Sequence, residues 1–209
     1  MVIADRFAWG HLPKAAGNTT LSLFQVFPEV IRYADPEDGH LKHTLFSERS
    51  AEVAGKELAL NIRRLPSWML SYWIFRSRHG IHPDYVPEPM SSPYAMSTSN
   101  VADAHLTPFI DSGGRRIEHW IRTEHLIDDF LAFISAFADL TPEKRARVAS
   151  ASKRNDQVYE RELSHWFTSD HILAMYRANP LWRRVELEVY GDTVIDWLPL
   201  SSDTTVETP

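Results

Sequence analysis

Short apolar runs alternate along the chain with longer segments of helical spacing, a pattern that predicts an α/β fold. Apolar residues fill 7–9 and, apart from Asn61, 58–62, lengths typical of buried strands. Segment 117–122 alternates enough to predict another strand. Apolar side chains at helical spacing follow each of these strands, in 21–27, 66–78 and 127–137. In open α/β sheets, ligands lie beyond the carboxyl ends of the strands. The segments that follow the predicted strands are therefore the first places to look for a site.

The remaining segments are less regular. Helices are predicted over 47–56, from the cap at Thr141 onward, and over 159–176, whereas 101–110 shows only weak periodicity. Segment 40–45 could be an edge strand or a helix start. Segment 79–100 holds four prolines, and a loop of that length is usually functional or disordered. We expect either a lid on the acceptor side of a site or an ordinary surface loop.

Length and composition are those of one globular domain. The chain has 209 residues, 44% hydrophobic and 24% charged, which predicts a single domain over 1–200 and a disordered polar tail over 201–209. A formal charge of −6 argues against broad nucleic-acid binding but allows a local basic pocket for one nucleotide. The absence of cysteine excludes disulfides and thiolate chemistry. No leader or membrane-spanning stretch is apparent, so we expect a cytoplasmic protein without membrane contact.

Residues 9–21 have the pattern of a strand, a turn of small residues and the start of a helix. This pattern is typical of a loop that binds an anion. Pro13 cannot donate to a sheet ladder and closes the strand. The residues behind Lys14 are small or favour helix N-termini, namely Ala15, Ala16, Gly17, Asn18, Thr19 and Thr20. Free amides and the positive end of the helix dipole would hold an anion beside Lys14. An ordinary turn is the alternative that this segment alone leaves open.

A second candidate anion contact stands at the end of the 58–62 strand. Arg63 and Arg64 follow the strand directly, and Pro66 then opens an aromatic-rich helix. Two arginines are thereby delivered to the carboxyl end of a predicted strand, the ligand edge of an α/β sheet. Taken alone, the pair could equally be solvated residues that cap the strand.

Three segments resemble motifs of the sulfotransferases, which take a sulfuryl group from 3′-phosphoadenosine 5′-phosphosulfate (PAPS). The order His11-x-Pro13-Lys14-x-x-Gly17-x-Thr19 resembles the family's 5′-phosphosulfate loop. Segment 63–71 is similar to its R-x-P-x-x-R-x-x-S pattern, with the proline one place late and Trp68 replacing the internal arginine. The third segment, similar to R-x-E-x-L…D-x, is Arg122-Thr123-Glu124-His125-Leu126 with Asp128-Asp129. The resemblance spans about 7–190.

This resemblance implies a three-layer P-loop-type fold with a central, mainly parallel sheet flanked by helices, and a bacterial rather than a Golgi-type enzyme. Lys14 would neutralise the oxygen between phosphate and sulfate, with the loop behind it holding the 5′-phosphosulfate. Arg63 and Ser71 would bind the 3′-phosphate, whereas an alignment anchored on the proline gives Arg64 and Tyr72. Arg154, in a polar loop, would be a further contact to the 3′-phosphate.

The acceptor needs a base, and His43 is our choice because family members use a histidine or glutamate from this stretch. Neutral imidazole can accept a proton near pH 7. His40 and Glu48 are alternatives. We expect His11 to be a positioning or core residue and Glu124 to be architectural. The sequence shows no metal site of recognised spacing, and sulfuryl transfer has less need of one than phosphoryl transfer, so we expect no metal.

We therefore predict a PAPS-dependent sulfotransferase acting on a hydroxyl or amine of a small-molecule or carbohydrate acceptor. The alternative is a nucleotide- or phosphate-binding module of P-loop type without transfer activity. A P-loop kinase is the least favoured reading, since the Walker pattern puts its lysine just inside the helix and here the lysine precedes the glycine turn.

Overall fold

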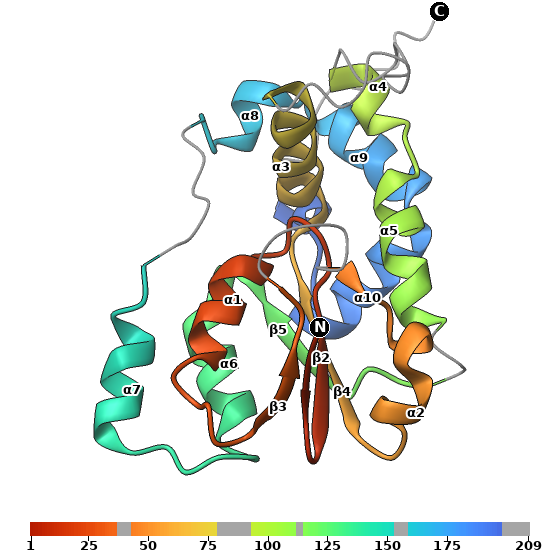
Figure 1. The fold of residues 1–209 in the computed structure, drawn as a ribbon. Coiled ribbons are helices and arrows are strands. Elements are labelled where there is room, and N and C mark those ends of the chain that lie inside the picture. Colours follow the sequence, from red (N-terminus) through yellow and green to blue (C-terminus); the bar gives the residue numbers. More distant parts are fainter. Residues whose placement is uncertain (37–42, 79–92, 112–114, 153–158, 198–209) are drawn as a thin grey trace, which may run out of the picture.

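A five-stranded mixed sheet with the order β3-β1-β2-β4-β5 forms the centre of the computed structural model (Figure 1). The structure describes residues 1–36, 43–78, 93–111, 115–152 and 159–197. The strands are β1 (Val2–Ala4), β2 (Phe7–Gly10), β3 (Ile31–Ala34), β4 (Glu57–Ile62) and β5 (His119–Arg122). β1 runs antiparallel to both β2 and β3, whereas the β2–β4 and β4–β5 pairs are parallel.

The α/β class is confirmed, and the sheet is mixed: it is partly parallel, and β1 introduces the antiparallel pairs. Neither β1 nor its partner β3 is predicted by a hydrophobic pattern. β1 spans only Val2–Ala4, too short to show alternation, and β3 has half-exposed and exposed positions. Their register instead comes from long-range pairing, with Ile3 opposite both Ala8 and Tyr33.

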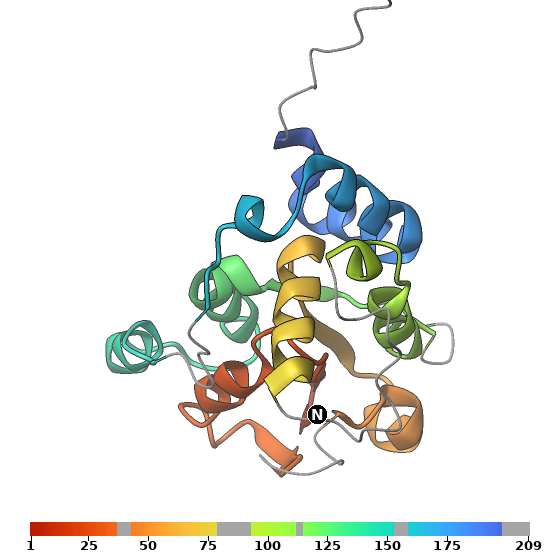
Figure 2. The ribbon, with the colours of Figure 1, turned by 90° about the horizontal axis from the view of Figure 1, so that it is seen from above.

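Helices cover both faces of the sheet (Figures 1 and 2). In chain order they are α1 (Gly17–Phe24), η2 (Phe46–Arg49), α2 (Ser50–Val53), α3 (Leu65–Arg78), α4 (Pro93–Ser97), α5 (Val101–Ile110), η5 (Thr123–His125), α6 (Leu126–Ile134), α7 (Pro142–Ala149), α8 (Leu163–Trp166), α9 (Ser169–Ala178), α10 (Pro180–Tyr190) and η6 (Val194–Trp197). Among these described helices, none is long and apolar enough to cross a membrane.

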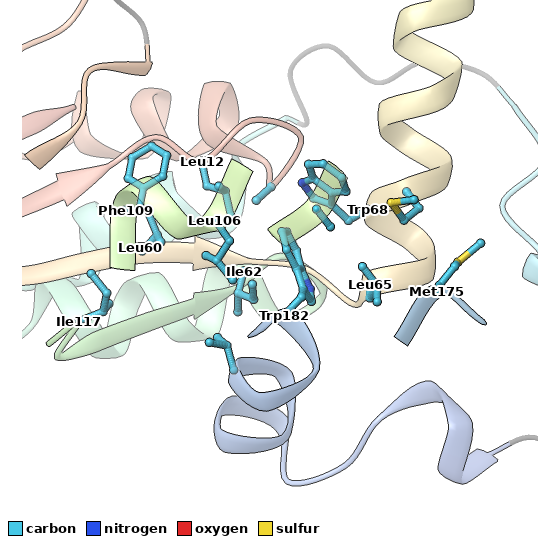
Figure 3. Packing of buried hydrophobic residues seen from close by; sticks show 14 of the residues in the cluster. Leu12, Leu60, Ile62, Leu65, Trp68, Leu106, Phe109, Ile117, Met175 and Trp182 are labelled. Atoms are coloured by element: carbon cyan, nitrogen blue, oxygen red, sulfur yellow. The ribbon is translucent and has the colours of Figure 1, made fainter. Parts of the chain in front are cut away.

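Strand side chains alternate between two hydrophobic cores, one on each face of the sheet. Leu58, Leu60 and Ile62 of β4 belong to the core beneath α3, α5, α9 and α10, part of which is drawn in Figure 3. Ala59, with Phe7 and Trp9 of β2, belongs to the other core, where α1 and α6 pack. Because both faces are buried, β4 is mostly apolar from Leu58 to Ile62, and its one polar residue there, Asn61, is buried and hydrogen-bonded.

Several helices differ from the sequence expectation. α5 forms where periodicity is weak, and the predicted helix over 159–176 is divided between α8 and α9. α4 lies within 79–100, so that segment is not irregular throughout; residues 79–92, with most of the predicted lid, lie outside the described residues. The predicted tail 201–209 also lies outside them.

Candidate functional site

The loops that follow β2 and β4 meet at one edge of the sheet. The two strands are parallel neighbours, with Gly10 in register with Leu60, so both end on the same side. The chain then leaves toward opposite faces, since α1 buries Leu23 and Phe24 in one core and α3 buries Leu65 and Met69 in the other. In open α/β sheets, ligands usually bind at the sheet edge where neighbouring connections leave toward opposite faces.

The backbone of the first loop adopts a conformation that non-glycine residues rarely use. Lys14 and Ala16 both have φ of 62°, in the left-handed region, and Ala16 is the residue that precedes α1. This conformation costs roughly 1–2 kcal/mol for a residue with a Cβ. The small residues of this loop predict a close approach of the backbone to a ligand, but no sequence pattern singles out Lys14 and Ala16. Strain of this kind is concentrated at functional sites and turns.

Replacing Ala16 with glycine should therefore raise the free energy of unfolding by about 1 kcal/mol, because glycine enters the left-handed region without strain. The matched control is Ala15→Gly, at a neighbouring buried position without positive φ, which should lower it. Chemical denaturation of the two variants measures both changes. If both glycines destabilise the protein equally, the strain at Ala16 is not real.

Gly17 is required by the ring of His11 rather than by its own backbone angles. A Cβ at residue 17 would lie 1.8 Å from His11 Nε2, and His11 is only 3% exposed. The His11 ring also lies 4.6 Å from the ring of His43, centroid to centroid. His11 thus fills the space behind the loop, in the positioning role expected for it, and links the loop to His43.

The amides that open α1 are placed to receive an anion, but Thr20 is not. Gly17 and Asn18 stand in the first turn, where no intrahelical acceptor exists, and their amides donate no backbone hydrogen bond within the described chain. The amide and hydroxyl of Thr20 both donate to the Ala16 carbonyl, at 3.0 and 3.2 Å. Its hydroxyl also accepts from Asn61 Nδ2. Thr20 therefore ties α1 to β4, which argues against its expected part in ligand binding.

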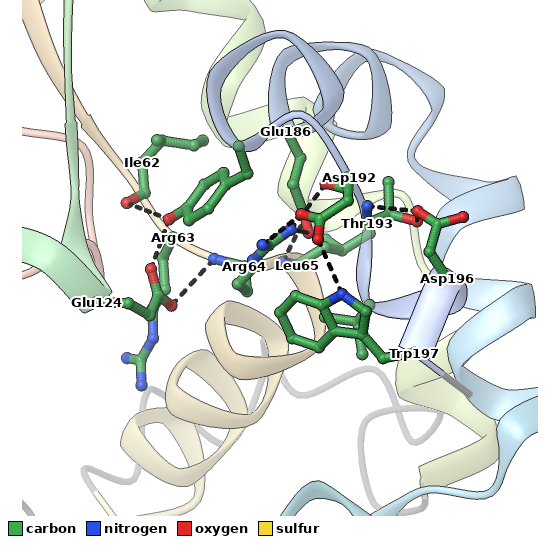
Figure 4. A network of polar contacts seen from close by, with 12 residues as sticks. Ile62, Arg63, Arg64, Leu65, Glu124, Glu186, Asp192, Thr193, Asp196 and Trp197 are labelled. Carbon is green, nitrogen blue, oxygen red and sulfur yellow. Dashed lines mark hydrogen bonds and ion pairs between the residues drawn. The ribbon is translucent and has the colours of Figure 1, made fainter. Parts of the chain in front are cut away.

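Arg63 and Arg64 have opposite surroundings. Arg64 is buried, and its guanidinium donates to Glu186 Oε1 at 3.2 Å and to Asp192 Oδ1 at 2.5 Å (Figure 4). Arg63 is directed away from this network, and its Nη1 lies 3.5 Å from the Lys14 carbonyl oxygen. Within the described chain Arg63 Nε is buried without a hydrogen-bond partner. The geometry favours Arg63 over Arg64 as the anion contact.

The Arg64 network is structural. Glu186 is fully buried, and it also accepts from the Leu65 amide and the Tyr176 hydroxyl. Burial raises the pKa of Glu186, because its charge has left water, and these donors oppose that shift. Arg64 is therefore needed to neutralise a buried carboxylate, and it is not available for a phosphate.

The third motif is architectural, as expected for Glu124. Its carboxylate accepts from the Arg64 amide at 3.2 Å and from the Tyr190 hydroxyl at 2.5 Å. Arg122 forms a paired contact with Asp129, both nitrogen–oxygen distances being 2.8 Å. Burial opposes ionisation of Asp129, but the hydrogen bonds from Arg122 outweigh it and hold the pKa below its usual value. These contacts join the end of β5 to β4, α6 and α10.

Asp129→Asn should lower the free energy of unfolding at pH 7 by about 1–3 kcal/mol, the range for a hydrogen bond to a charged group. Since the folded pKa of Asp129 is depressed, the wild-type advantage exists above pH 4 and is lost as the pH falls through the folded value. Urea unfolding at pH 7 and pH 3 measures the difference. A cost that does not shrink at pH 3 would contradict this ion pair.

One face of α3 lies against the loop. Trp68 Nε1 donates to the Pro13 carbonyl at 2.7 Å, and the Lys14 ammonium lies 4.2 Å from the centroid of the Phe75 ring. Positions 68, 71, 72 and 75 share a helix face, so Ser71 and Tyr72 lie between these two contacts. Ser71 is buried, and no hydrogen bond joins it to Arg63 or the loop within the described part of the chain. Its role in binding the 3′-phosphate stays a prediction.

His43 lies beside the loop after β2, and its Nδ1 is hydrogen-bonded. Its Nδ1 is 2.8 Å from the His11 carbonyl oxygen. A carbonyl only accepts, so Nδ1 donates, and the lone pair of the neutral ring is then on Nε2. Of the alternatives, Glu48 accepts from the Leu45 amide at the start of η2. His40 and Arg154 lie outside the described residues.

No family model, curated protein or solved structure matches this chain. A functional conclusion therefore depends on the chemistry of its own residues.

Two surface depressions are lined by residues outside the loops that follow β2 and β4. One lies over α6 and α7, with Asp128 and Arg145 in its lining, and the other lies between β5 and α6, with Glu118 and Asp129. Both linings include carboxylates, which disfavour a polyanionic ligand. In the described ranges, no three His, Asp or Glu side chains gather as a possible metal site.

Proposed function

We propose that this protein is a sulfotransferase of P-loop type, with three layers around the mixed sheet, that takes its sulfuryl group from PAPS in the cytoplasm. The acceptor would be a hydroxyl or amine of a small molecule or carbohydrate. The observation that carries the proposal is the contact between Arg63 and the Lys14 carbonyl. Arg63 has no carboxylate partner within the described residues. This contact places it beside the loop that leads into the N-terminus of α1.

The proposed site fits a molecule with two anionic ends. The amides of Gly17 and Asn18 would bind the 5′-phosphosulfate, in the way that helix N-termini bind phosphates. Arg63 would bind the 3′-phosphate, which would satisfy its buried Nε. A buried donor without a partner costs about 1–3 kcal/mol, so an anionic ligand that accepts from Arg63 Nε is favoured.

In the proposed reaction the acceptor oxygen forms a bond to sulfur while the bond from sulfur to the bridging oxygen breaks. The electron pair of that bond stays on the 5′-phosphate of 3′-phosphoadenosine 5′-phosphate, the product that leaves. His43 Nε2 takes the acceptor proton, and Lys14 stabilises the charge that grows on the leaving oxygen. The protein residues act through position and charge and form no covalent bond to the sulfuryl group, as in phosphoryl transfer.

A nucleotide- or phosphate-binding module without transfer activity is the second candidate. The observation that favours it is the position of Lys14, whose ammonium faces the Phe75 ring at 4.2 Å. A cation–π contact is worth about 0.5–2 kcal/mol, which the lysine must give up to reach a leaving oxygen. In a module that only binds, Lys14 could remain there.

Calorimetry with 3′-phosphoadenosine 5′-phosphate and with adenosine 5′-phosphate tests the site. The wild type should bind the first about 10- to 100-fold more tightly, the effect of one or two charge-assisted hydrogen bonds. Arg63→Met should abolish this preference while retaining the fold, whereas Lys14→Met should weaken both ligands. Equal affinity of the wild type for the two nucleotides would overturn the proposal.

A transfer assay with PAPS that carries a radiolabelled sulfuryl group distinguishes a sulfotransferase from a module that only binds the nucleotide. The sulfotransferase should transfer label to a member of an acceptor panel, and His43→Gln should reduce transfer at least about 100-fold with little effect on nucleotide affinity. Tight binding with no transfer to any acceptor, and no release of labelled sulfate, would favour the binding module.

A further inference from the structure

Two buried tryptophans connect the loop after β2 to the residue at the end of β4. Trp68 Nε1 donates to the Pro13 carbonyl at 2.7 Å, and Trp182 Nε1 donates to the Arg63 carbonyl at 3.0 Å. The two indole rings are in contact, with centroids 4.9 Å apart, and Figure 3 shows them side by side. Both residues have no exposed surface. A continuous path therefore runs from Pro13 through both indoles to Arg63.

The path ends at the carbonyl groups of Pro13 and Arg63, and both belong to the segments that form the proposed site. Pro13 directly precedes Lys14, and the Arg63 carbonyl belongs to the residue whose guanidinium contacts the Lys14 carbonyl. Each indole N–H has a fixed direction and donates only, so its ring sets where the carbonyl lies. The two rings together define the separation between the loop and Arg63.

The surroundings of the pair keep it rigid. Tyr72 stacks on Trp68 with ring centroids 5.0 Å apart and an angle of 9°, and His105 contacts both rings. Trp182 stands in the first turn of α10, where its amide donates to Asp103 Oδ1 of α5 at 2.7 Å. Close-packed interiors respond to displacement by discrete shifts rather than gradual ones. A change at either indole is therefore transmitted to the site.

We propose that Trp68 and Trp182 are positioning residues that set the spacing between the loop amides and the Arg63 guanidinium, and so select a ligand with two phosphates over one with a single phosphate. This inference rests on the proposed nucleotide site. Trp68 stands where the family motif has an arginine. In this proposal it sets the distance between the loop and Arg63 instead of supplying a charge. Neither tryptophan touches the ligand, and both act through backbone carbonyls.

Trp68→Phe and Trp182→Phe keep an aromatic ring and remove the N–H. The readout is the ratio of dissociation constants for adenosine 5′-phosphate and 3′-phosphoadenosine 5′-phosphate, measured well below the melting temperature. Each variant should lower the ratio roughly five- to tenfold, as expected for a lost hydrogen bond. In an Arg63→Met background, Trp182→Phe should change the ratio no further.

The matched control is Trp166→Phe, which removes an equivalent indole bond, to the Glu160 carbonyl at 2.8 Å, outside the site. This control should leave the ratio unchanged. Nuclear magnetic resonance of the wild type gives a second readout that needs no variant. Adding 3′-phosphoadenosine 5′-phosphate should slow solvent exchange of the Trp68 and Trp182 indole protons and leave that of Trp166 unaltered.

The possible failures are distinguishable. A wild type that binds both nucleotides equally would overturn the proposed function and this inference with it. A wild type that discriminates, together with Trp68→Phe and Trp182→Phe variants that discriminate as well as Trp166→Phe, would overturn the inference alone. If the variants do not fold, unchanged exchange of the Trp68 and Trp182 indole protons in the wild type would overturn it.

Discussion

Arg64→Met should lower the free energy of unfolding by about 3–5 kcal/mol, the range observed when one partner of a buried ion pair is removed. The substitution leaves the Glu186 carboxylate fully buried, with hydrogen bonds from Leu65 and Tyr176 but without a cation. Arg63→Met is the matched control and should change stability by less than about 1 kcal/mol, since it breaks no ion pair in the described chain. Urea denaturation of the two variants measures the contrast.

The loss in Arg64→Met should also depend on pH. Burial already raises the pKa of Glu186, and removal of Arg64 raises it further. A raised carboxyl pKa means that the folded state is favoured while Glu186 is protonated and is penalised as the pH rises through the folded value. The variant should therefore be closer to the wild type at pH 5 than at pH 8, and adding Glu186→Gln should reduce this pH dependence. Equal stability losses in Arg63→Met and Arg64→Met would contradict the distinction between the two arginines.

Gly17→Ala has the second largest expected effect on stability, a loss of about 2–3 kcal/mol, at the upper end of the range for overpacking. The new Cβ would lie 1.8 Å from Nε2 of His11, whose side chain is buried, so the ring or the loop would have to move. The clash would also displace the backbone at residue 17, whose amide belongs to the proposed anion site, so nucleotide binding should weaken.

A double-mutant cycle tests the stated cause. In a His11→Ala background the clash is absent, and Gly17→Ala should then cost less than about 1 kcal/mol. Thermal denaturation of the four proteins gives the coupling. The same cost in both backgrounds would show that His11 is not the reason for glycine at position 17.

The parallel strands and the position of the candidate site in the fold could be predicted from local patterns. β2, β4 and β5 are apolar or alternating runs followed by helices, and Pro66 and the Thr141–Pro142 cap mark helix starts. Those patterns put Lys14 and Arg63 at the ends of neighbouring strands, and the structure brings the two into contact. Local sequence order was sufficient for this prediction because the carboxyl ends of neighbouring parallel strands lie at the same edge of the sheet.

The rest depends on partners that are distant in sequence. α5 has weak periodicity and an internal proline, but Asp103 on it accepts the amides of Leu181 and Trp182 and so caps α10. The sequence favours Arg63 over Arg64, but it does not show that Arg64 pairs with Glu186 and Asp192. The role of Gly17 depends on the ring of His11 folding back on it, and no short-range pattern contains that information.

A crystal structure with 3′-phosphoadenosine 5′-phosphate bound tests the central claim most directly. We predict that the 5′-phosphate will accept hydrogen bonds from the amides of Gly17 and Asn18 while the 3′-phosphate contacts the Arg63 guanidinium, with Arg64 still on Glu186. A nucleotide bound elsewhere on the protein, or bound here with Arg63 turned away from both phosphates, would contradict the account.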